Sequence, residues 1–471
     1  MIRTTWAIVL ALLVGCANAQ EPAPSPLPAR PTDAPATAAP ATAAPATAEP
    51  QPRRVAAGPS DWPTFLGPTQ DGVSTERGII APWPAEGLRK VWECELGVGL
   101  APPAVADGRL FHFDRFEDNC RLTCRDAATG KFHWQYEFPT DYVDRYGYYP
   151  GPRACPLVVG ERVYVYGPEG VLACVRVADG KELWKIDTVA KYHIHQNFFG
   201  VGSVPLIDGE LLIVAIGGSP DGPRPFDFRQ ARSNGTAIVA FDKKTGQQKY
   251  AAGAELSSYA SPVIRTLNGQ KTGLYFARGG LLGFDPQTGA TRFHYKWRAK
   301  IEESVNAANP VVVGDKVFLS ECYGPGSSLI ELKNGQPKEV WTDAEKDQVD
   351  KSMMCHWNTP IHHAGFVYGC SGRHDNEADL RCVELASGEV KWKKRRTFRC
   401  TLLMVDGYFV SLSEYGDLSL FRVNAEKYDE VSKYRVKELE YPCWAPPVLS
   451  HGLLYVRGKE KLLALELIPQ K

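Results

Sequence analysis

Pro156-Leu-Val-Val-Gly160-Glu-Arg-Val-Tyr-Val-Tyr166 is the stretch that decides the fold of this chain. The apolar residues after Pro156 suit a short strand, and Gly160 suits the tight turn that follows it. The alternating segment up to Tyr166 suits a second strand. A further strand then leads to the turn Ala178-Asp-Gly-Lys181, with Trp184 beyond it. The stretch therefore predicts the beginning of a small antiparallel sheet.

The same pattern of proline, apolar residue, turn glycine and alternating strand recurs about every 49 residues. Many copies also carry a second glycine turn followed by an aromatic residue, as at Gly130 with Trp134 and at Gly388 with Trp392. This period is that of a four-stranded propeller blade. Eight copies predict an all-β, eight-bladed β-propeller, and they begin at Pro103, Pro156, Pro205, Pro262, Pro310, Pro360, Leu403 and Pro447.

The last copy is one strand short, because the chain stops near Leu467 after three strands. An orphan strand with its own aromatic residue, Lys90-Val-Trp-Glu-Cys-Glu-Leu96, precedes the first copy. Pairing this strand with the last copy would complete the eighth blade and remove the exposed edges of an open sheet. Residues 89–471 are therefore predicted to form one closed ring.

The segment before the ring divides into three parts. Residues 1–19 are typical of an export signal, with a short apolar run from Trp6 to Val14. Its end is compatible with lipidation of Cys16 after Leu13-Val-Gly15, or with cleavage after Ala19. Residues 20–58 form a Pro/Ala/Thr-rich linker, and residues 59–88 form a lead segment expected to pack on the propeller.

Charge and cysteine content exclude several classes of protein. Lys+Arg and Asp+Glu both number 54, so the chain lacks the basic excess of a nucleic-acid binder. Twelve cysteines are too few for a fold built on disulfides. Cys124, Cys174 and Cys382 occupy one small-residue position of the repeat, where cysteine serves as a small apolar side chain. Cys370 and Cys382 flank one hairpin and remain a candidate bridge.

Candidate binding residues stand just before each innermost strand. The residue two places before the blade's proline is nearly always small, whereas the residue three places before it varies freely. Strand alternation places the variable position on the opposite side of the chain. We therefore predict a funnel mouth lined by Arg153, Tyr259, Asn309, Trp357 and Trp444. The alternative is that these side chains plug the channel or pack on long loops.

The repeat resembles the PQQ-like repeat of quinoprotein-type eight-bladed propellers, and Asp61-Trp-Pro-Thr-Phe-Leu-Gly67 is similar to the lead segment of exported bacterial members. That family includes PQQ-dependent alcohol dehydrogenases and BamB-like lipoproteins, which scaffold the outer-membrane β-barrel assembly machine without a quinone. The dehydrogenases carry a ring of two adjacent cysteines, and this chain has no Cys-Cys pair. Under the dehydrogenase alternative, Trp357 and Trp444 would stack on PQQ. Oxygens for Ca²⁺ would come from Glu303, Asn306 and Asn309.

The favoured interpretation is an exported, lipid-anchored, monomeric scaffold of the bacterial envelope or periplasm, held to a membrane through Cys16. It would bind envelope protein partners, with no nucleic acid, no catalytic residue, no metal and no cofactor. A PQQ/Ca-dependent alcohol dehydrogenase is the first alternative, and a carbohydrate- or peptide-binding propeller is the second.

Overall fold

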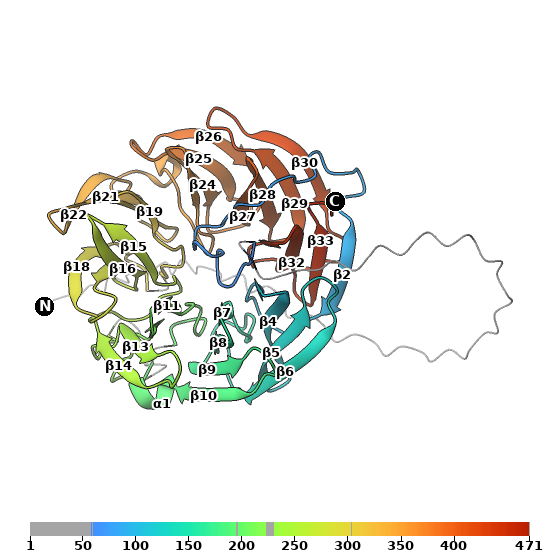
Figure 1. Cartoon of the computed structure of the whole chain (residues 1–471). Helices are drawn as coiled ribbons and strands as arrows, with labels where there is room; N and C mark the ends of the chain where they lie inside the picture. The colour runs from blue at the N-terminus through green and yellow to red at the C-terminus, as the bar shows by residue number, and fades with distance from the viewer. Residues whose placement is uncertain (1–57, 59, 195, 223–229, 303, 471) are drawn as a thin grey trace, which may run out of the picture. The chain divides into compact units, whose positions relative to one another are not determined.

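The computed structural model describes residues 58–470, except residues 59, 195, 223–229 and 303. Its strands form eight sheets arranged around a ring, as Figure 1 shows. Seven sheets have four strands and one has five. The prediction of an all-β, eight-bladed propeller is therefore confirmed.

The first four blades follow one another along the chain, each from its inner to its outer strand. They consist of β3 (Ala104–Ala106), β4 (Arg109–Phe116), β5 (Asn119–Asp126) and β6 (Phe132–Pro139); β7 (Leu157–Val159), β8 (Arg162–Tyr166), β9 (Val171–Arg176) and β10 (Glu182–Asp187); β11 (Leu206–Asp208), β12 (Leu211–Ala215), β13 (Ile238–Asp242) and β14 (Gln248–Ala252); and β15 (Val263–Leu267), β16 (Gln270–Phe276), β17 (Gly280–Phe284) and β18 (Thr291–Lys296).

The remaining blades continue around the ring. They consist of β19 (Val311–Val313), β20 (Lys316–Glu321), β21 (Gly326–Lys333) and β22 (Gln336–Thr342); β23 (Ile361–His363), β24 (Phe366–Ser371), β25 (Asp379–Glu384) and β26 (Val390–Arg395); β27 (Cys400–Val405), β28 (Tyr408–Ser413), β29 (Asp417–Arg422) and β30 (Asp429–Arg435); and β31 (Val448–Ser450), β32 (Leu453–Arg457) and β33 (Lys461–Glu466) with β2 (Lys90–Glu95). Two short helices, α1 (Thr188–Tyr192) and η1 (Gln348–Asp350), lie in connecting loops. No described helix has the length and apolarity needed to cross a membrane.

The ring is closed by the predicted N-terminal strand. β2 pairs antiparallel with β33, with Cys94 opposite Leu462, and it forms the outer edge of the eighth blade. Figure 1 shows the blue β2 beside the red β33. Middle strands are buried on both faces because each blade is covered by two neighbours; in β9, residues 172–175 are fully buried. The outer strand β6 instead alternates between buried and exposed residues.

Residues 61–76 cross the centre of the ring, where the blue chain lies in Figure 1. Trp62 exchanges two backbone hydrogen bonds of 2.8 Å with Val105 of blade one. A two-residue strand, β1 (Val73–Ser74), adds a fifth strand to blade seven by pairing in parallel with β27. Glu76 accepts a hydrogen bond of 2.7 Å from the Gly452 amide of blade eight. These contacts engage the first and second strands of the blades, near the turns that join them.

All eleven cysteines in the described part of the chain are unpaired. A bridge between Cys370 and Cys382 does not form, because Cys370 lies opposite Leu380 whereas Cys382 lies opposite Tyr368. Cys124, Cys174 and Cys382 are fully buried, which agrees with the role expected of the small-residue position. Cys16 lies outside the described residues.

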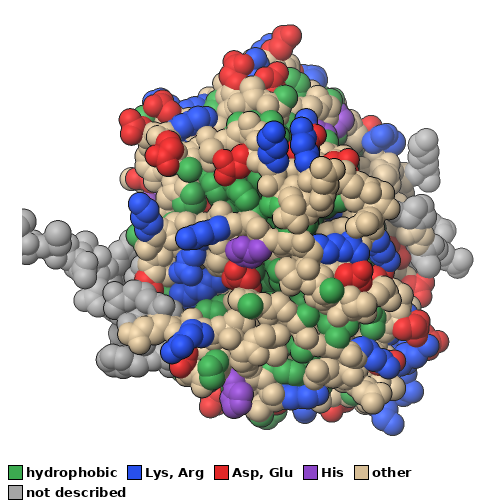
Figure 2. Space-filling model, turned by 90° about the vertical axis from the view of Figure 1, so that its left-hand side faces the viewer, with side chains coloured by type: hydrophobic (Ala, Val, Ile, Leu, Met, Phe, Trp, Pro, Cys, Tyr) green, Lys and Arg blue, Asp and Glu red, His purple; other side chains and the backbone are tan. Residues whose placement is uncertain are grey.

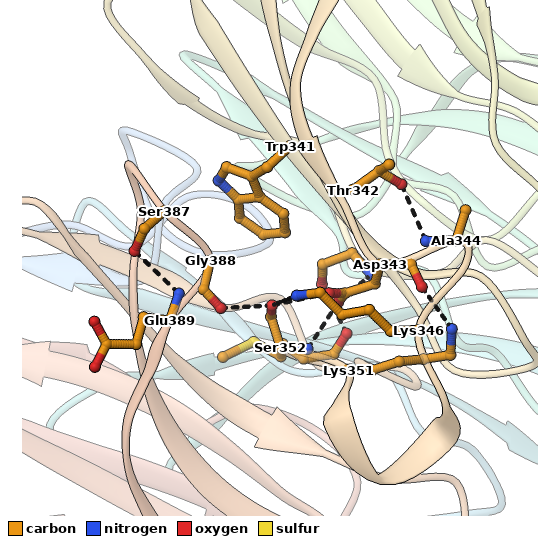
Figure 3. Close-up of polar contacts among 12 residues, drawn as sticks. Trp341, Thr342, Asp343, Ala344, Lys346, Lys351, Ser352, Ser387, Gly388 and Glu389 are labelled. Carbon is orange, nitrogen blue, oxygen red and sulfur yellow. Dashed lines mark hydrogen bonds and ion pairs between the residues drawn. The ribbon is translucent and has the colours of Figure 1, made fainter.

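Blades five and six are joined by a buried polar network around Asp343, shown in Figure 3. The Asp343 carboxylate accepts hydrogen bonds from the Ser352 amide and hydroxyl at 2.8 and 2.9 Å, and from the Ser327 amide at 3.0 Å. Lys346 pairs with the same carboxylate at 2.9 Å. Lys351, only 3% exposed, donates to the Asp343 carbonyl. The network therefore satisfies a charge that would be costly to bury alone.

The side of the ring formed by blades four and five carries charges of both signs. Figure 2 shows Lys and Arg interspersed with Asp and Glu on this side. Such mixing is consistent with a net charge of zero. It differs from the single-signed surface by which proteins attract a polyanion.

Candidate functional site: the loop face of the channel

The loops that join the outer strand of one blade to the inner strand of the next all lie on one face of the ring. This follows because every blade has the same strand order and direction. The predicted mouth residues belong to these loops. Residues 61–76 contact the other ends of the inner strands, so the loop face is the face on which the channel could open.

Arg153 lies in the loop between β6 and β7. Its guanidinium pairs with the buried Asp144 carboxylate at 3.0 Å and donates to the Phe199 carbonyl at 2.9 Å. It also lies over the Phe199 ring, 5.6 Å from the centroid. Arg153 is therefore held in place from three sides, and its side chain is only 14% exposed.

Tyr259 lies beside the same phenylalanine, with ring centroids 5.7 Å apart. Its hydroxyl accepts hydrogen bonds from the amides of Phe198 and Phe199, at 3.1 and 2.7 Å. Burial raises the pKa of this hydroxyl well above its ordinary value of 10. Gly202 lies against Tyr259 and leaves room for its ring, since a β-carbon on Gly202 would lie 3.0 Å from it. The structure thus joins Arg153 and Tyr259 in one aromatic cluster.

Trp357 and Trp444 form a second cluster, with ring centroids 4.8 Å apart. The Arg399 guanidinium lies 4.6 Å from the Trp357 centroid and 5.4 Å from that of Trp444. Arg399 also forms a tight ion pair with Glu414, whose side chain is fully buried. The Trp444 indole donates to the same carboxylate at 3.3 Å. These contacts fix both indoles and occupy one of their faces with a cation.

Asn309 has a different environment from the other four predicted residues. Its buried side-chain oxygen accepts a hydrogen bond of 2.7 Å from the Ser261 backbone amide. Its backbone N–H donates to the Thr359 hydroxyl at 3.0 Å. These bonds link blades four, five and six near their inner strands. The described contacts of Asn309 are therefore contacts between blades.

Several residues that contact the predicted mouth residues were missed by the sequence analysis. Tyr323 belongs to the same apolar group as Phe199 and Tyr259, and its hydroxyl lies 3.0 Å from His356 Nε2. His356 in turn lies 4.9 Å from the Trp357 ring. Apolar packing on Phe198 and Val305, followed by ring contacts from Tyr323 through His356 to Trp357, therefore connects the two clusters. Four blades contribute to these contacts through the predicted repeat position, at Arg153, Tyr259, Trp357 and Trp444. The other members stand outside that position, so the repeat gives no signal for them.

The aromatic chain extends outward on both sides. Tyr146 and Tyr148 contact Phe199 from the loop between β6 and β7, and they are 46% and 51% exposed. At the other end, Tyr441 contacts Trp444 and stacks on Tyr415. We call this set the aromatic belt, and it comprises Tyr146, Tyr148, Phe198, Phe199, Tyr259, Tyr323, His356, Trp357, Phe398, Tyr415, Tyr441 and Trp444.

Burial is the main cause of the pKa shifts in and beside the belt. Burial, assisted by the positive charges of Arg399 and Arg373, lowers the pKa of His356 to about 3. Beside Tyr323, burial raises the pKa of Glu321 to about 7. One Glu321 oxygen bonds the Ser304 hydroxyl at 3.0 Å, while Oε2 is buried with no hydrogen-bond partner. Near neutral pH, His356 is therefore neutral and Glu321 is partly protonated.

The described residues named for PQQ and calcium have contacts with other protein groups. The Trp357 and Trp444 rings contact each other at a tilt of 37°, and the Arg399 guanidinium lies over both. The Asn309 oxygen accepts from the Ser261 amide. The Asn306 side chain donates through its NH₂ group to the Ala277 carbonyl, while its buried oxygen has no hydrogen-bond partner within the described part of the chain. Glu303 lies outside the described residues. Among the described residues, no group of three His, Cys, Asp or Glu side chains could hold a metal ion.

Solved structures with the same fold include dehydrogenases and a BamB protein. A europium-containing methanol dehydrogenase matches 86% of this chain and 91% of its own length, with TM-score 0.64 and 12% identity. The quinohemoprotein alcohol dehydrogenase from Comamonas testosteroni matches 88% of this chain and 82% of its own length, with TM-score 0.58 and 12% identity. BamB from Moraxella catarrhalis matches 82% of this chain and 99% of its own length, with TM-score 0.53 and 14% identity. Identities this low establish the fold alone.

Sequence comparison with protein families is more specific. No curated protein sequence matched the chain. The profile of one family, described as outer membrane protein assembly factor BamB, matches residues 77–218 and 149–394. These matches cover more than half of the chain, and they agree with the resemblance seen in the repeats. The chain therefore belongs to the PQQ-repeat β-propeller family of outer membrane protein assembly factor BamB.

Proposed function

We propose that this protein is a non-catalytic scaffold of the bacterial envelope that binds a partner protein through the loop face of its propeller. The observation that carries the proposal is the distribution of exposed apolar side chains. Of the twelve large apolar side chains that are exposed among the described residues, eight lie in the loops of this face: Val98, Val143, Tyr146, Tyr148, Ile301, Val349, Phe398 and Tyr441. Exposed apolar groups gathered on one face are typical of protein-binding surfaces.

The composition of the belt supports a protein partner over a catalytic role. Tyrosine, tryptophan and arginine are the residues that dominate binding energy at protein interfaces. Here Arg153, Arg373 and Arg399 lie over aromatic rings of the belt, at 5.6, 4.5 and 4.6 Å. Such packing holds large side chains in one conformation before a partner arrives, which lowers the entropy lost on binding.

The export signal and Cys16 complete the proposal. A lipid attached to Cys16 would tether the protein, and the linker of residues 20–58 would separate the membrane from the ring. Replacing Cys16 with Ser tests the tether. We expect Cys16→Ser to move the protein from the membrane fraction to the soluble fraction, and unchanged fractionation would refute the anchor.

Capture of partners from solubilised envelope tests the binding face. We expect the full-length protein to capture a reproducible protein partner, and the triple variant Tyr148→Ser/Phe398→Ser/Tyr441→Ser to lose it. The matched control replaces three equally exposed residues of outer strands, Phe132, Leu183 and Val340, with Ser. Equal capture by both variants would refute the assignment of the face. Dye-linked alcohol oxidation after addition of PQQ and Ca²⁺ would refute the non-catalytic role.

A further inference from the structure

One face of blade one differs from the corresponding face of the other blades. The small residue of this blade is Cys124, which pairs with Phe111 of the neighbouring strand. Arg125 follows Cys124, and His112 follows Phe111. In the other seven blades, the residue equivalent to Arg125 is apolar, and the residue equivalent to His112 carries no charge. The Arg125 equivalents are Val175, Phe241, Phe284, Ile330, Val383, Phe421 and Leu465, and the His112 equivalents are Val165, Val214, Tyr275, Leu319, Gly369, Ser411 and Val456.

These polar residues line a cavity of about 170 Å³. The cavity lies at the seam where β2 of blade eight faces β4, β5 and β6 of blade one, and Glu95 and Leu96 contribute from the blade-eight side. A cavity of about 150 Å³ is large enough to hold benzene. The seam therefore has room for a small organic molecule.

The interior of the cavity presents hydrogen-bond donors. His112 is 2% exposed, and its Nε2 accepts a hydrogen bond of 3.3 Å from Arg125. Its proton is therefore on Nδ1 in the neutral ring. That atom is buried with no hydrogen-bond partner, since Asp114 lies 3.7 Å away. Thr123, 3% exposed, adds a hydroxyl to the lining. Because His112 Nδ1 lies beside the Asp114 carboxylate, the donors left for a ligand are Arg125 and the Thr123 hydroxyl.

The charges of the cavity favour an anion. Arg121 is neutralised by two hydrogen bonds to Asp114, at 2.9 and 3.0 Å. Arg125 instead bonds His112 and the Gly130 carbonyl, and it forms no ion pair with any residue of the described chain. Glu95 is largely exposed and pairs with Lys461 at 3.6 Å. The partly buried Arg125 guanidinium therefore has no carboxylate partner among the described residues.

The rim of the cavity is aromatic. Phe116 and Phe132 line it from β4 and β6, and each is 49% exposed. Arg121 lies 4.6 Å from the Phe116 ring centroid and orders it. A ligand that paired with Arg125 would thus have its apolar part between or beside two phenyl rings, which favour aromatic neighbours.

We propose that the seam between blades eight and one binds a small organic monocarboxylate with an apolar ring. Its carboxylate accepts hydrogen bonds from Arg125 and Thr123, and its ring packs against Phe116 and Phe132. None of these residues belongs to the aromatic belt, so this site would work independently of the proposed partner face.

Titration calorimetry with benzoate on the full-length protein tests the proposal. Benzamide has the same shape without the charge, and inorganic phosphate has the charge without the ring. We expect saturable binding of benzoate, and binding of the other two weaker by about tenfold or more, because charge-assisted hydrogen bonds are the stronger class. No saturable binding of benzoate, or equal binding of benzamide, would overturn the proposal. Tighter binding of phosphate would overturn the choice of a carboxylate.

Two variants locate the site. Arg125→Met should weaken benzoate binding about tenfold or more, whereas Arg396→Met, in an exposed basic stretch, should leave it unchanged. Phe132→Ala removes an exposed side chain and keeps the fold, so it remains informative if Arg125→Met is unstable. We expect it to weaken binding several-fold, with Leu183→Ala of β10 as its control. Unchanged benzoate binding in Phe132→Ala and Arg125→Met would overturn the assignment.

Discussion

The indole ring of Trp134 occupies the space that a side chain on Gly180 would need. A β-carbon on Gly180 would lie 2.6 Å from Trp134, and the indole Nε1 donates to the Val177 carbonyl at 2.9 Å. The tryptophan belongs to blade one and the glycine turn to blade two. The same contact recurs between Trp92 and Gly130 and between Trp341 and Gly388. The repeated aromatic residue of one blade and the repeated glycine of the next therefore form one recurring contact between blades, which we call the joint.

This joint predicts an asymmetry among the turn glycines. Gly180 has φ of +76°, so Gly180→Ala would both strain the backbone and collide with Trp134. We expect it to lower the free energy of unfolding by about 2–4 kcal/mol, from the positive φ and the overpacking together. Gly209 has φ of +60° with nothing within 4 Å of a β-carbon, so Gly209→Ala should cost only about 1–2 kcal/mol. Urea unfolding measures both, and equal losses would contradict the joint.

The Asp343 network predicts a large effect from the loss of a single charge. In Asp343→Asn one oxygen becomes an NH₂ group. At Oδ1 this group would face the Lys346 ammonium, which cannot accept, and at Oδ2 it would face the Ser327 and Ser352 amides. We expect a loss of about 3 kcal/mol in the free energy of unfolding, because buried donors are left unsatisfied. Asp347→Asn, at an exposed cap without a side-chain hydrogen bond, is the control. An effect below about 1 kcal/mol would show that the network contributes little.

Glu321 predicts a loss of stability as pH rises. Its pKa is raised to about 7, because burial penalises the charged carboxylate, whereas the unfolded chain ionises near the ordinary value of 4.5. Below pH 4.5 both states hold the proton. Between about pH 4.5 and 7 the unfolded state loses it first, so the native state is destabilised by up to about 3 kcal/mol.

Glu321→Gln stays neutral at every pH, so it should be more stable than the original protein at pH 8 and should show a smaller loss between pH 4.5 and 7. Glu345→Gln, at an exposed position, is the control. Unfolding by urea at several pH values gives the difference directly. Parallel curves for Glu321→Gln and the original protein would contradict the raised pKa.

The propeller followed from the repeat because its signals are local. Proline, turn glycine and alternating strand lie within a dozen residues, and the missing last strand identified Lys90–Leu96 as its replacement. The two-residue strand β1 has no such pattern, and its place in blade seven depends on residues more than 300 positions away. The two clusters of the loop face were predictable only in part. Arg153, Tyr259, Trp357 and Trp444 share a repeat position, but Arg399 and Tyr323 reach them from loops without a repeat.

His356 predicts the opposite dependence on pH. Burial, with the nearby Arg399 and Arg373, lowers its pKa to about 3, while an unfolded histidine titrates near 6.5. The native state therefore keeps its full stability above pH 6.5, and it loses stability as pH falls from about 6.5 to 3, by up to about 4–5 kcal/mol. His356→Gln can still bond the Tyr323 hydroxyl and carries no charge, so it should resist acid better.

The exposed His363 provides the matched control, since His363→Gln changes the same residue type without removing a buried ring. Unfolding at pH 7 and at pH 4.5 should show a smaller difference in His356→Gln than in the original protein and in His363→Gln. Because Trp357 lies 4.9 Å from His356, tryptophan fluorescence in the native baseline gives a second readout at the belt itself. An acid sensitivity that is unchanged in His356→Gln would mean that this ring is not the group that protonates on unfolding.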